Sequence, residues 1–160
     1  MAYTMQVEGI EELSKKLVEL GDKADGVAAL SLYEGARVMA DAYSAAANGL
    51  KAEEFHYAFG GNRRGTSYEE KAAILGRVGI AKFDKNGSEV STSIGLSGKL
   101  GYVQIGNSKI AVRLLINAIN KGTEFRTADK AFRSAKNKAQ AAASGAIIAK
   151  ADQLIETMTK

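Results

Sequence analysis

The chain has 160 residues, enough for one domain, and it contains no cysteine, which excludes disulfides, thiolate zinc sites and thiol nucleophiles. Its net charge is +4, but its 22 basic and 18 acidic residues are interleaved, whereas a dedicated nucleic-acid binder usually gathers basic residues on one face. No apolar run approaches the ~20 residues of a membrane span, and no secretory leader pattern opens the chain, so we expect a protein kept in the cytoplasm of its host.

Two helices are predicted in the first third of the chain. Apolar residues at steps of three and four predict a helix over 7–20, which Gly21 is suited to end. A second helix is predicted over 24–47, capped by Asp22 or Asp25 and ended by Asn48-Gly49. Its predicted inner stripe is mostly small, so that another element can approach closely: Ala28, Leu32, Ala36, Met39, Tyr43 and Ala46.

Residues 50–66 form the least regular part, which we interpret as a flexible loop or docking arm. Phe55, Tyr57 and Phe59 lie on one side if this segment is extended, and a glycine-rich loop with Arg63 and Arg64 follows. The three aromatic residues either dock a neighbouring subunit or cover this domain's own core. The single histidine of the chain has no cysteine or second histidine to complete a metal site.

A short helix and a hairpin are predicted next. Ser67 with Glu70 three residues later is a capping signal for a helix to about Leu75. Alternating residues over 77–96 predict a hairpin, with Asp84-Lys85-Asn86-Gly87 as a type I turn closed by a glycine bulge. That turn places Ile80 opposite Thr92 and Val78 opposite Ile94, which keeps one face apolar.

The last third of the chain is predicted to add a strand and two helices. The strand covers 100–105, and Asn107 or Ser108 caps a helix through about Asn120. Its inward residues are predicted to be Ile110, Leu114, Ile116 or Asn117, and Ala118. The final helix runs over about 128–157, with one face marked by Phe132, Ala135, Ala139, Ala142, Ala146, Ile147, Ala151, Leu154 and Met158.

These elements predict one α+β domain over 1–160. Its small twisted antiparallel sheet consists of the 77–96 hairpin and one or two further strands, and long helices near the two ends of the chain pack on it.

The residues do not favour an enzyme. No Ser-His-Asp order suits a catalytic triad, and no glycine-rich phosphate loop is present. Three pairs of adjacent glutamates, at 11–12, 53–54 and 69–70, are interpreted as surface acids, because adjacent residues on a helix point in different directions. We therefore expect no catalytic residue, metal or cofactor.

Two segments resemble a family of bacteriophage proteins. Val7-Glu8-Gly9-Ile10-Glu11-Glu12-Leu13 is similar to the opening of the neck and tail-completion proteins of long-tailed phages, which continues into a helix like the one around Glu34-Gly35-Ala36-Arg37. Gly122-Thr123, followed by the 128–135 segment around Phe132, resembles the family's C-terminal phrase in order and spacing. The two prolines of that phrase are Ala131 and Ser134 here.

The resemblance implies a virion protein, made in the host cytoplasm, that forms a ring at the head-to-tail junction or at the top of the tail tube. Implied partners are further copies of itself, most often six, the head connector or stopper, and the tail-tube proteins, with DNA passing through the channel without sequence-specific contact. Candidate subunit-interface residues are Phe55, Tyr57, Phe59, Arg63, Arg64, Asn86, Phe125 and Phe132. The alternative is a nucleic-acid-binding accessory module that uses the loop with Arg63 and Arg64, which predicts salt-sensitive binding to duplex DNA.

Overall fold

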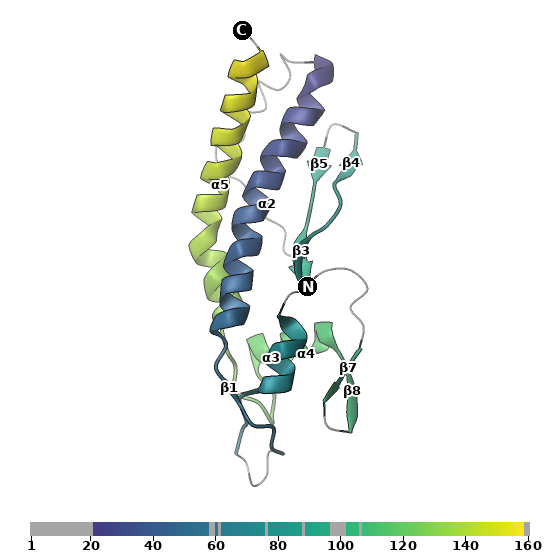
Figure 1. Cartoon of the computed structure of the whole chain (residues 1–160), viewed down its shortest axis with the longest axis vertical. Helices are drawn as coiled ribbons and strands as arrows, with labels where there is room; N and C mark the ends of the chain where they lie inside the picture. Colours follow the sequence, from purple (N-terminus) through teal and green to yellow (C-terminus); the bar gives the residue numbers. More distant parts are fainter. Residues whose placement is uncertain are drawn as a thin grey trace.

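The structure, a computed structural model, describes residues 21–57, 60, 62–75, 77–87, 89–96, 102–105 and 107–158. The predicted α+β class is confirmed, with two long helices and several two-stranded pairings. Helices α2 (Ala24–Gly49) and α5 (Ala131–Met158) lie side by side along the length of the molecule (Figure 1). The helix predicted over 7–20 lies outside the described residues.

The pairing of α2 with α5 rests on small residues. Gly35 is buried, and a Cβ atom at this position would overlap Cγ1 of Ile147 on α5. The close approach of the two backbones therefore requires a glycine here. Small serine and alanine side chains extend the contact on both helices. The buried residues are Val27, Ser31, Gly35, Ala36, Met39, Tyr43 and Ala47 on α2, and Phe132, Ala139, Ala143, Ile147 and Ala151 on α5.

Helix ends and inner stripes differ in detail from the sequence prediction. Lys23, and neither predicted aspartate, is the N-cap of α2, and it makes no side-chain cap hydrogen bond. Helix α5 begins at Ala131, where the Asp129 carboxylate accepts a hydrogen bond from the backbone N–H of Ala131 at 2.9 Å. In α5, Ala143 is buried where Ala142 was expected, because burial follows the crossing with α2 and alanines occupy nearly every position of that stretch.

The hairpin forms with a register different from the predicted one. Strand β4 (Asp84–Asn86) pairs with β5 (Glu89–Ser91), and β3 (Val78–Ile80) pairs with β6 (Ile94–Leu96). Asn86 is opposite Glu89, so a two-residue turn with Gly87 at φ 63° replaces the predicted four-residue turn. One extra residue between β3 and β4 then sets Val78 opposite Leu96 and Ile80 opposite Ile94. The predicted partners were wrong because the turn begins only after Asn86, further along the chain than predicted, and the extra residue then brings the apolar residues back opposite one another.

A second hairpin replaces the start of the helix predicted through about Asn120. Strand β7 (Tyr102–Ile105) pairs with β8 (Ser108–Ala111), and helix α4 (Val112–Lys121) begins only after β8. Residues 106–107 are Gly-Asn, a turn pair whose hairpin signal outweighed the cap signal of Asn107 and Ser108. With this shift Leu114 is 59 % exposed, and the buried set of α4 is Val112, Leu115, Ile116 and Ile119.

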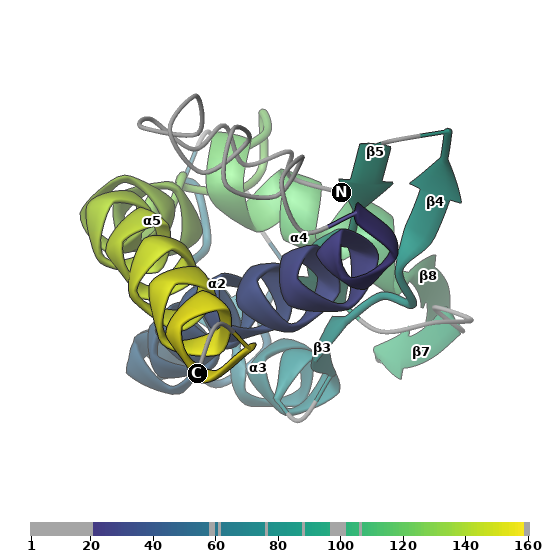
Figure 2. The ribbon, with the colours of Figure 1, turned by 90° about the horizontal axis from the view of Figure 1, so that it is seen from above.

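The short elements flank α2 at different heights. Viewed from above in Figure 2, α2 lies between α5 on one side and the β4–β5 hairpin on the other. Helix α3 (Tyr68–Ile74) and α4 lie near the end where α2 terminates (Figure 1), and a short parallel pair joins β1 (Ala52–Glu53) to β2 (Thr66–Ser67). One core cluster links α2, α3, α4 and α5 through residues such as Tyr43, Ile74, Ile119 and Phe132. In the part of the chain that the structure describes, no helix is long and apolar enough to span a membrane.

Candidate subunit-interface site

A fully buried carboxylate, that of Glu70, organises the end of the molecule formed by α3 and α4. Ser67 caps α3 and accepts a hydrogen bond from the Glu70 backbone N–H, while a Glu70 carboxylate oxygen accepts one from the Ser67 backbone N–H at 2.8 Å. This confirms the predicted capping box, which fixes Glu70 at the third position of the helix. The Glu70 carboxylate also accepts hydrogen bonds from two arginines.

Arg64 and Arg126 both donate to the Glu70 carboxylate. Arg64 does so with Nη1 at 2.9 Å and Nη2 at 2.7 Å, a two-pronged contact, and Arg126 donates from Nη2. Both guanidinium groups also donate to the backbone carbonyl of Gly65 at 3.3 Å. The Arg64 guanidinium lies 4.9 Å from the centre of the Phe55 ring, so an aromatic face supports it on one side.

Backbone hydrogen bonds hold the two arginine loops together. The N–H of Arg64 donates to the carbonyl of Phe125 at 3.0 Å, and the N–H of Thr127 donates to the carbonyl of Arg64 at 3.0 Å. Gly122 ends α4 at φ 72°, a conformation that favours glycine, and turns the chain into this contact. The Gly122-Thr123 pair singled out in the sequence therefore brings Arg126 to Glu70.

The charges of this cluster do not cancel. Burial alone would raise the pKa of Glu70, but the hydrogen bonds from Arg64 and Arg126 outweigh it and hold the pKa below its ordinary value. One carboxylate thus faces two guanidinium groups, both largely buried. Glu53 accepts a hydrogen bond from the Gly65 N–H at 2.6 Å, but its side chain is 48 % exposed and pairs with His56 at 3.9 Å. Counted over the described residues, the buried part of the cluster keeps an excess of one positive charge.

An open pocket of about 270 Å³ lies over this cluster. Its walls are mainly apolar, and Leu114 and Phe125 on its rim are each 59 % exposed. The full lining is Arg64, Glu70, Ile110, Leu114, Leu115, Ala118, Thr123, Phe125 and Arg126. We call the pocket and its rim the pocket surface. It combines a buried positive charge with uncovered apolar area, which suits an acidic group carried on an apolar body.

The predicted interface residues divide into three groups. Arg64, Phe55 and Phe125 belong to the pocket end, where Tyr57 is exposed and contacts Phe55 edge-on at 5.2 Å. Arg63 is exposed, and so is Asn86 at the turn of the distant hairpin. Phe132 is buried in the core against Tyr43, with ring centres 6.2 Å apart, so its proposed role at a subunit interface was wrong. Phe59 lies outside the described residues.

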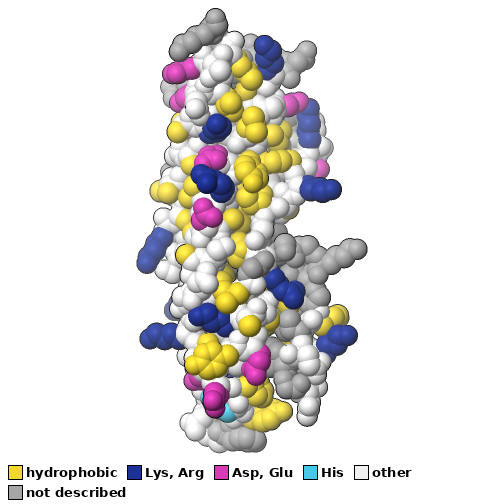
Figure 3. Space-filling model, viewed as in Figure 1, with side chains coloured by type: hydrophobic (Ala, Val, Ile, Leu, Met, Phe, Trp, Pro, Cys, Tyr) yellow, Lys and Arg dark blue, Asp and Glu magenta, His cyan; other side chains and the backbone are white. Residues whose placement is uncertain are grey.

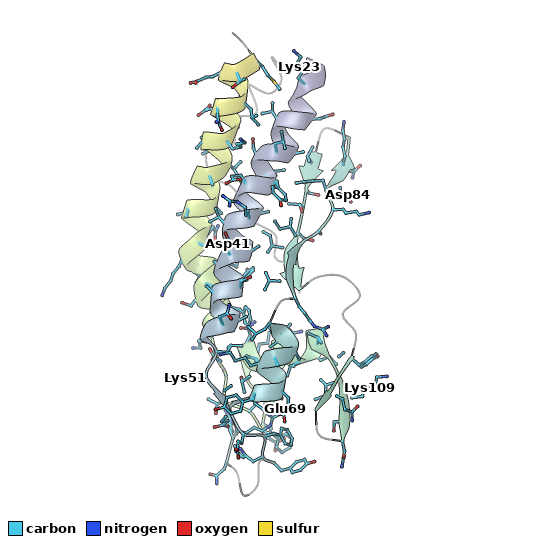
Figure 4. The ribbon with its side chains drawn as sticks, in the orientation of Figure 1. Lys23, Asp41, Lys51, Glu69, Asp84 and Lys109 are labelled. Carbon is cyan, nitrogen blue, oxygen red and sulfur yellow. The ribbon has the colours of Figure 1, made fainter. Side chains whose placement is uncertain are left out.

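Sequence reasoning missed Glu70, Arg126 and Lys71 as structural groups. Glu69 is exposed as expected of a surface acid (Figure 4), whereas Glu70 is not. Lys71 donates from Nζ to the carbonyls of Asn48 and Leu50 at 2.7 and 2.8 Å, where α2 ends. The capping box was the available signal, because its glutamate must turn back towards the start of its helix.

Comparisons with protein-family models, with curated proteins and with solved structures find no match to this chain. The site is therefore interpreted from its own geometry. Within the described residues, no group of three or more histidine, aspartate or glutamate side chains could hold a metal ion.

A second uncovered apolar surface lies beside the β4–β5 hairpin. Tyr33 on α2 contacts Phe83 at 6.5 Å between ring centres, and both remain exposed, as does Leu30 one turn earlier on α2. We call these three residues the hairpin surface. On the face shown in Figure 3, hydrophobic side chains occur in patches along the length of the molecule, with charged groups of both signs among them. The β4–β5 hairpin and helices α3 and α4, which carry these two surfaces, lie towards opposite ends of the long axis (Figure 1).

Proposed function

We propose that the chain is a structural virion protein of a tailed bacteriophage, forming a ring at the head-to-tail junction or at the top of the tail tube. The proposal is supported by the order of the elements that the resemblance calls for. A long helix, α2, precedes a hairpin, and Gly122-Thr123 then leads into a long closing helix, α5. Helix α2 contains the Glu34-Gly35-Ala36-Arg37 segment of the resemblance.

The observation that carries the proposal is the pair of unlike apolar surfaces. The hairpin surface and the pocket surface expose large side chains that a folded monomer normally covers or keeps scattered. A ring is built by a heterologous contact, in which one surface of each subunit meets a different surface of the next. Two unlike surfaces on one chain meet that requirement, and the mechanism is then assembly without catalysis.

The alternative nucleic-acid module loses much of its proposed binding loop. Arg64 is committed to Glu70, which leaves Arg63 as the exposed arginine of that pair. Phosphate contacts require cations that can replace the counterions along a DNA backbone, and the Arg64 side chain, largely buried beneath the pocket, does not present such a surface cation.

The test is the assembly state of the purified chain. We expect native mass spectrometry and electron microscopy to show a closed ring, hexameric by the resemblance, alone or with the connector and tail-tube proteins. Phe83→Ser alters the hairpin surface and Leu114→Gln the pocket surface, and each variant alone should be monomeric. A mixture of the two should form a heterodimer through the one intact contact, and no ring. A chain that stays monomeric at high concentration and with those partners would overturn the proposal.

A further inference from the structure

Among the described residues, Glu70 is the one buried carboxylate of the ion cluster beneath the pocket, and it faces two guanidinium groups. Arg126 is buried and lines the pocket, but within the described residues it uses only Nη1, to Gly65, and Nη2, to Glu70. A guanidinium has five N–H donors, and buried donors are normally satisfied. Arg64 lines the same pocket with its side chain 15 % exposed. The pocket therefore offers positive charge and hydrogen-bond donors to an incoming acceptor.

The size and rim of the pocket favour a protein side chain over a free small molecule. At about 270 Å³ it lies at or below the lower end of the ~300–1,000 Å³ typical of small-molecule sites. Leu114 and Phe125 extend apolar area beyond the cavity itself, where a residue next to the acidic one can lie. An aromatic residue adjacent to an aspartate or glutamate matches this arrangement.

Such a pair stands on the hairpin surface. An aromatic residue next to an acid occurs in the described part of the chain at Tyr33-Glu34, Glu54-Phe55, Tyr68-Glu69, Phe83-Asp84 and Glu124-Phe125. Phe55 and Phe125 belong to the pocket end itself, which removes two of these pairs. Glu34 is already paired with Arg37 at 2.6 Å, and Tyr68-Glu69 lies on α3, the helix that itself carries Glu70 of the pocket. Asp84 is exposed on β4 and has no ion pair among the described residues. It lies towards the opposite end of the long axis from Glu69 and Lys109 (Figure 4).

We propose that the pocket receives Phe83 and Asp84 from a second copy of this chain, the Asp84 carboxylate meeting Arg64 and Arg126 and the Phe83 ring lying on Leu114 and Phe125. This inference rests on the ring proposed above and adds the chemistry of its contact. The carboxylate balances the excess positive charge with charge-assisted hydrogen bonds. The ring covers apolar area that each free subunit exposes.

The direct test uses a peptide and one full-length variant. The probe is the blocked peptide acetyl-Lys-Phe-Asp-Lys-amide, which corresponds to residues 82–85, and its control carries Asn in place of Asp. Both are titrated by NMR into the Phe83→Ser variant, whose own hairpin surface is altered while its pocket is unchanged. We expect the Asp peptide to bind at least about tenfold more tightly than the Asn peptide, a difference that fades with added salt. The side-chain N–H signals of Arg64 and Arg126 should shift on binding.

Two controls locate the effect. Leu114→Gln, added to Phe83→Ser, should weaken peptide binding about tenfold, whereas Leu30→Gln, a change of similar exposure at the other end, should not. In the intact chain, Asp84→Asn should weaken association more than Asp41→Asn, which changes an exposed acid outside both surfaces.

Equal binding of the Asp and Asn peptides would overturn the inference, and so would butyrate binding as tightly as the Asp peptide, because the occupant would then be a free acid. A ring that assembles with the same affinity after Asp84→Asn would overturn the inference and leave the proposed function standing. Peptide binding by a chain that never forms a ring would overturn the proposed function and leave the binding chemistry of the pocket standing.

Discussion

Arg126 donates a hydrogen bond to the carboxylate of Glu70, a residue 56 positions earlier in the chain. This contact joins the turn before α5 to the start of α3, and Arg64 joins the segment between β1 and β2 to the same carboxylate. The segments around Arg64, Glu70 and Arg126, which do not belong to a common sheet, are thus held together by one buried carboxylate. The same acid leaves a surplus positive charge beneath the pocket, so a stabilising contact also prepares the surface that we propose for assembly.

Replacing Glu70 by Gln should be among the most destabilising single changes in the chain. The variant leaves two largely buried guanidinium groups facing a neutral amide, and breaking a buried ion pair in this way costs about 3–5 kcal/mol. The free energy of unfolding from urea denaturation measures the loss. Glu69→Gln, the neighbouring exposed acid, should change it by less than about 0.5 kcal/mol. Equal effects of the two substitutions would contradict the role assigned to Glu70.

The lowered pKa of Glu70 predicts an acid-sensitive fold. A carboxylate with a folded pKa below its unfolded value stabilises the protein above the unfolded pKa, and that stabilisation is lost as pH falls through the folded pKa. For Glu70, whose pKa lies below its ordinary value of 4.5, the loss should begin near pH 4.5 and continue below it. Urea denaturation between pH 7 and pH 3 should show this decline, and Glu70→Gln should have a flatter profile. Parallel profiles would show that other groups cause the acid sensitivity.

The sequence predicted local features better than their long-range use. Ser67 and Glu70 predict a capping box from the sequence alone, because both partners lie within one turn of helix. Arg126, by contrast, meets Glu70 only after the whole chain has folded, and no local pattern marks that meeting. The predicted hairpin register was wrong because the turn was inferred from Asp84 to Gly87, whereas the pairing of β4 with β5 continues to Asn86. An irregularity between β3 and β4, which no local pattern marks, then restores the apolar pairs. A segment as short as Ser108–Ala111 fits a strand or a helix equally well, and pairing with β7 decides between them.

Gly35 and Gly145 should respond in opposite directions to alanine. A methyl group at 35 would overlap the Ile147 side chain and lie 3.0 Å from the carbonyl oxygen of Ala143, so overpacking should cost about 1–3 kcal/mol. A methyl group at Gly145 in α5 would meet no neighbouring atom within 4 Å, so Gly145→Ala should stabilise the helix by up to about 1 kcal/mol. Thermal denaturation of both variants checks the contrast. If Gly35→Ala also stabilised the fold, α2 and α5 could not be packed as closely as described.

Alanine substitutions of Phe125 and Phe132 should distinguish an effect on assembly from an effect on folding. Phe132 is 4 % exposed and packs on Tyr43, so Phe132→Ala should lower the free energy of unfolding by about 3–5 kcal/mol. Phe125 is 59 % exposed on the pocket rim, so Phe125→Ala should leave the stability of the monomer within about 0.5 kcal/mol of the original. Its effect should appear instead in sedimentation, as a shift from assembled species to monomer, because the alanine removes area that the neighbouring subunit is proposed to cover. Urea denaturation at low protein concentration and sedimentation at high concentration measure the two effects separately. If Phe125→Ala assembled like the original chain, the pocket rim would lie outside the subunit contact.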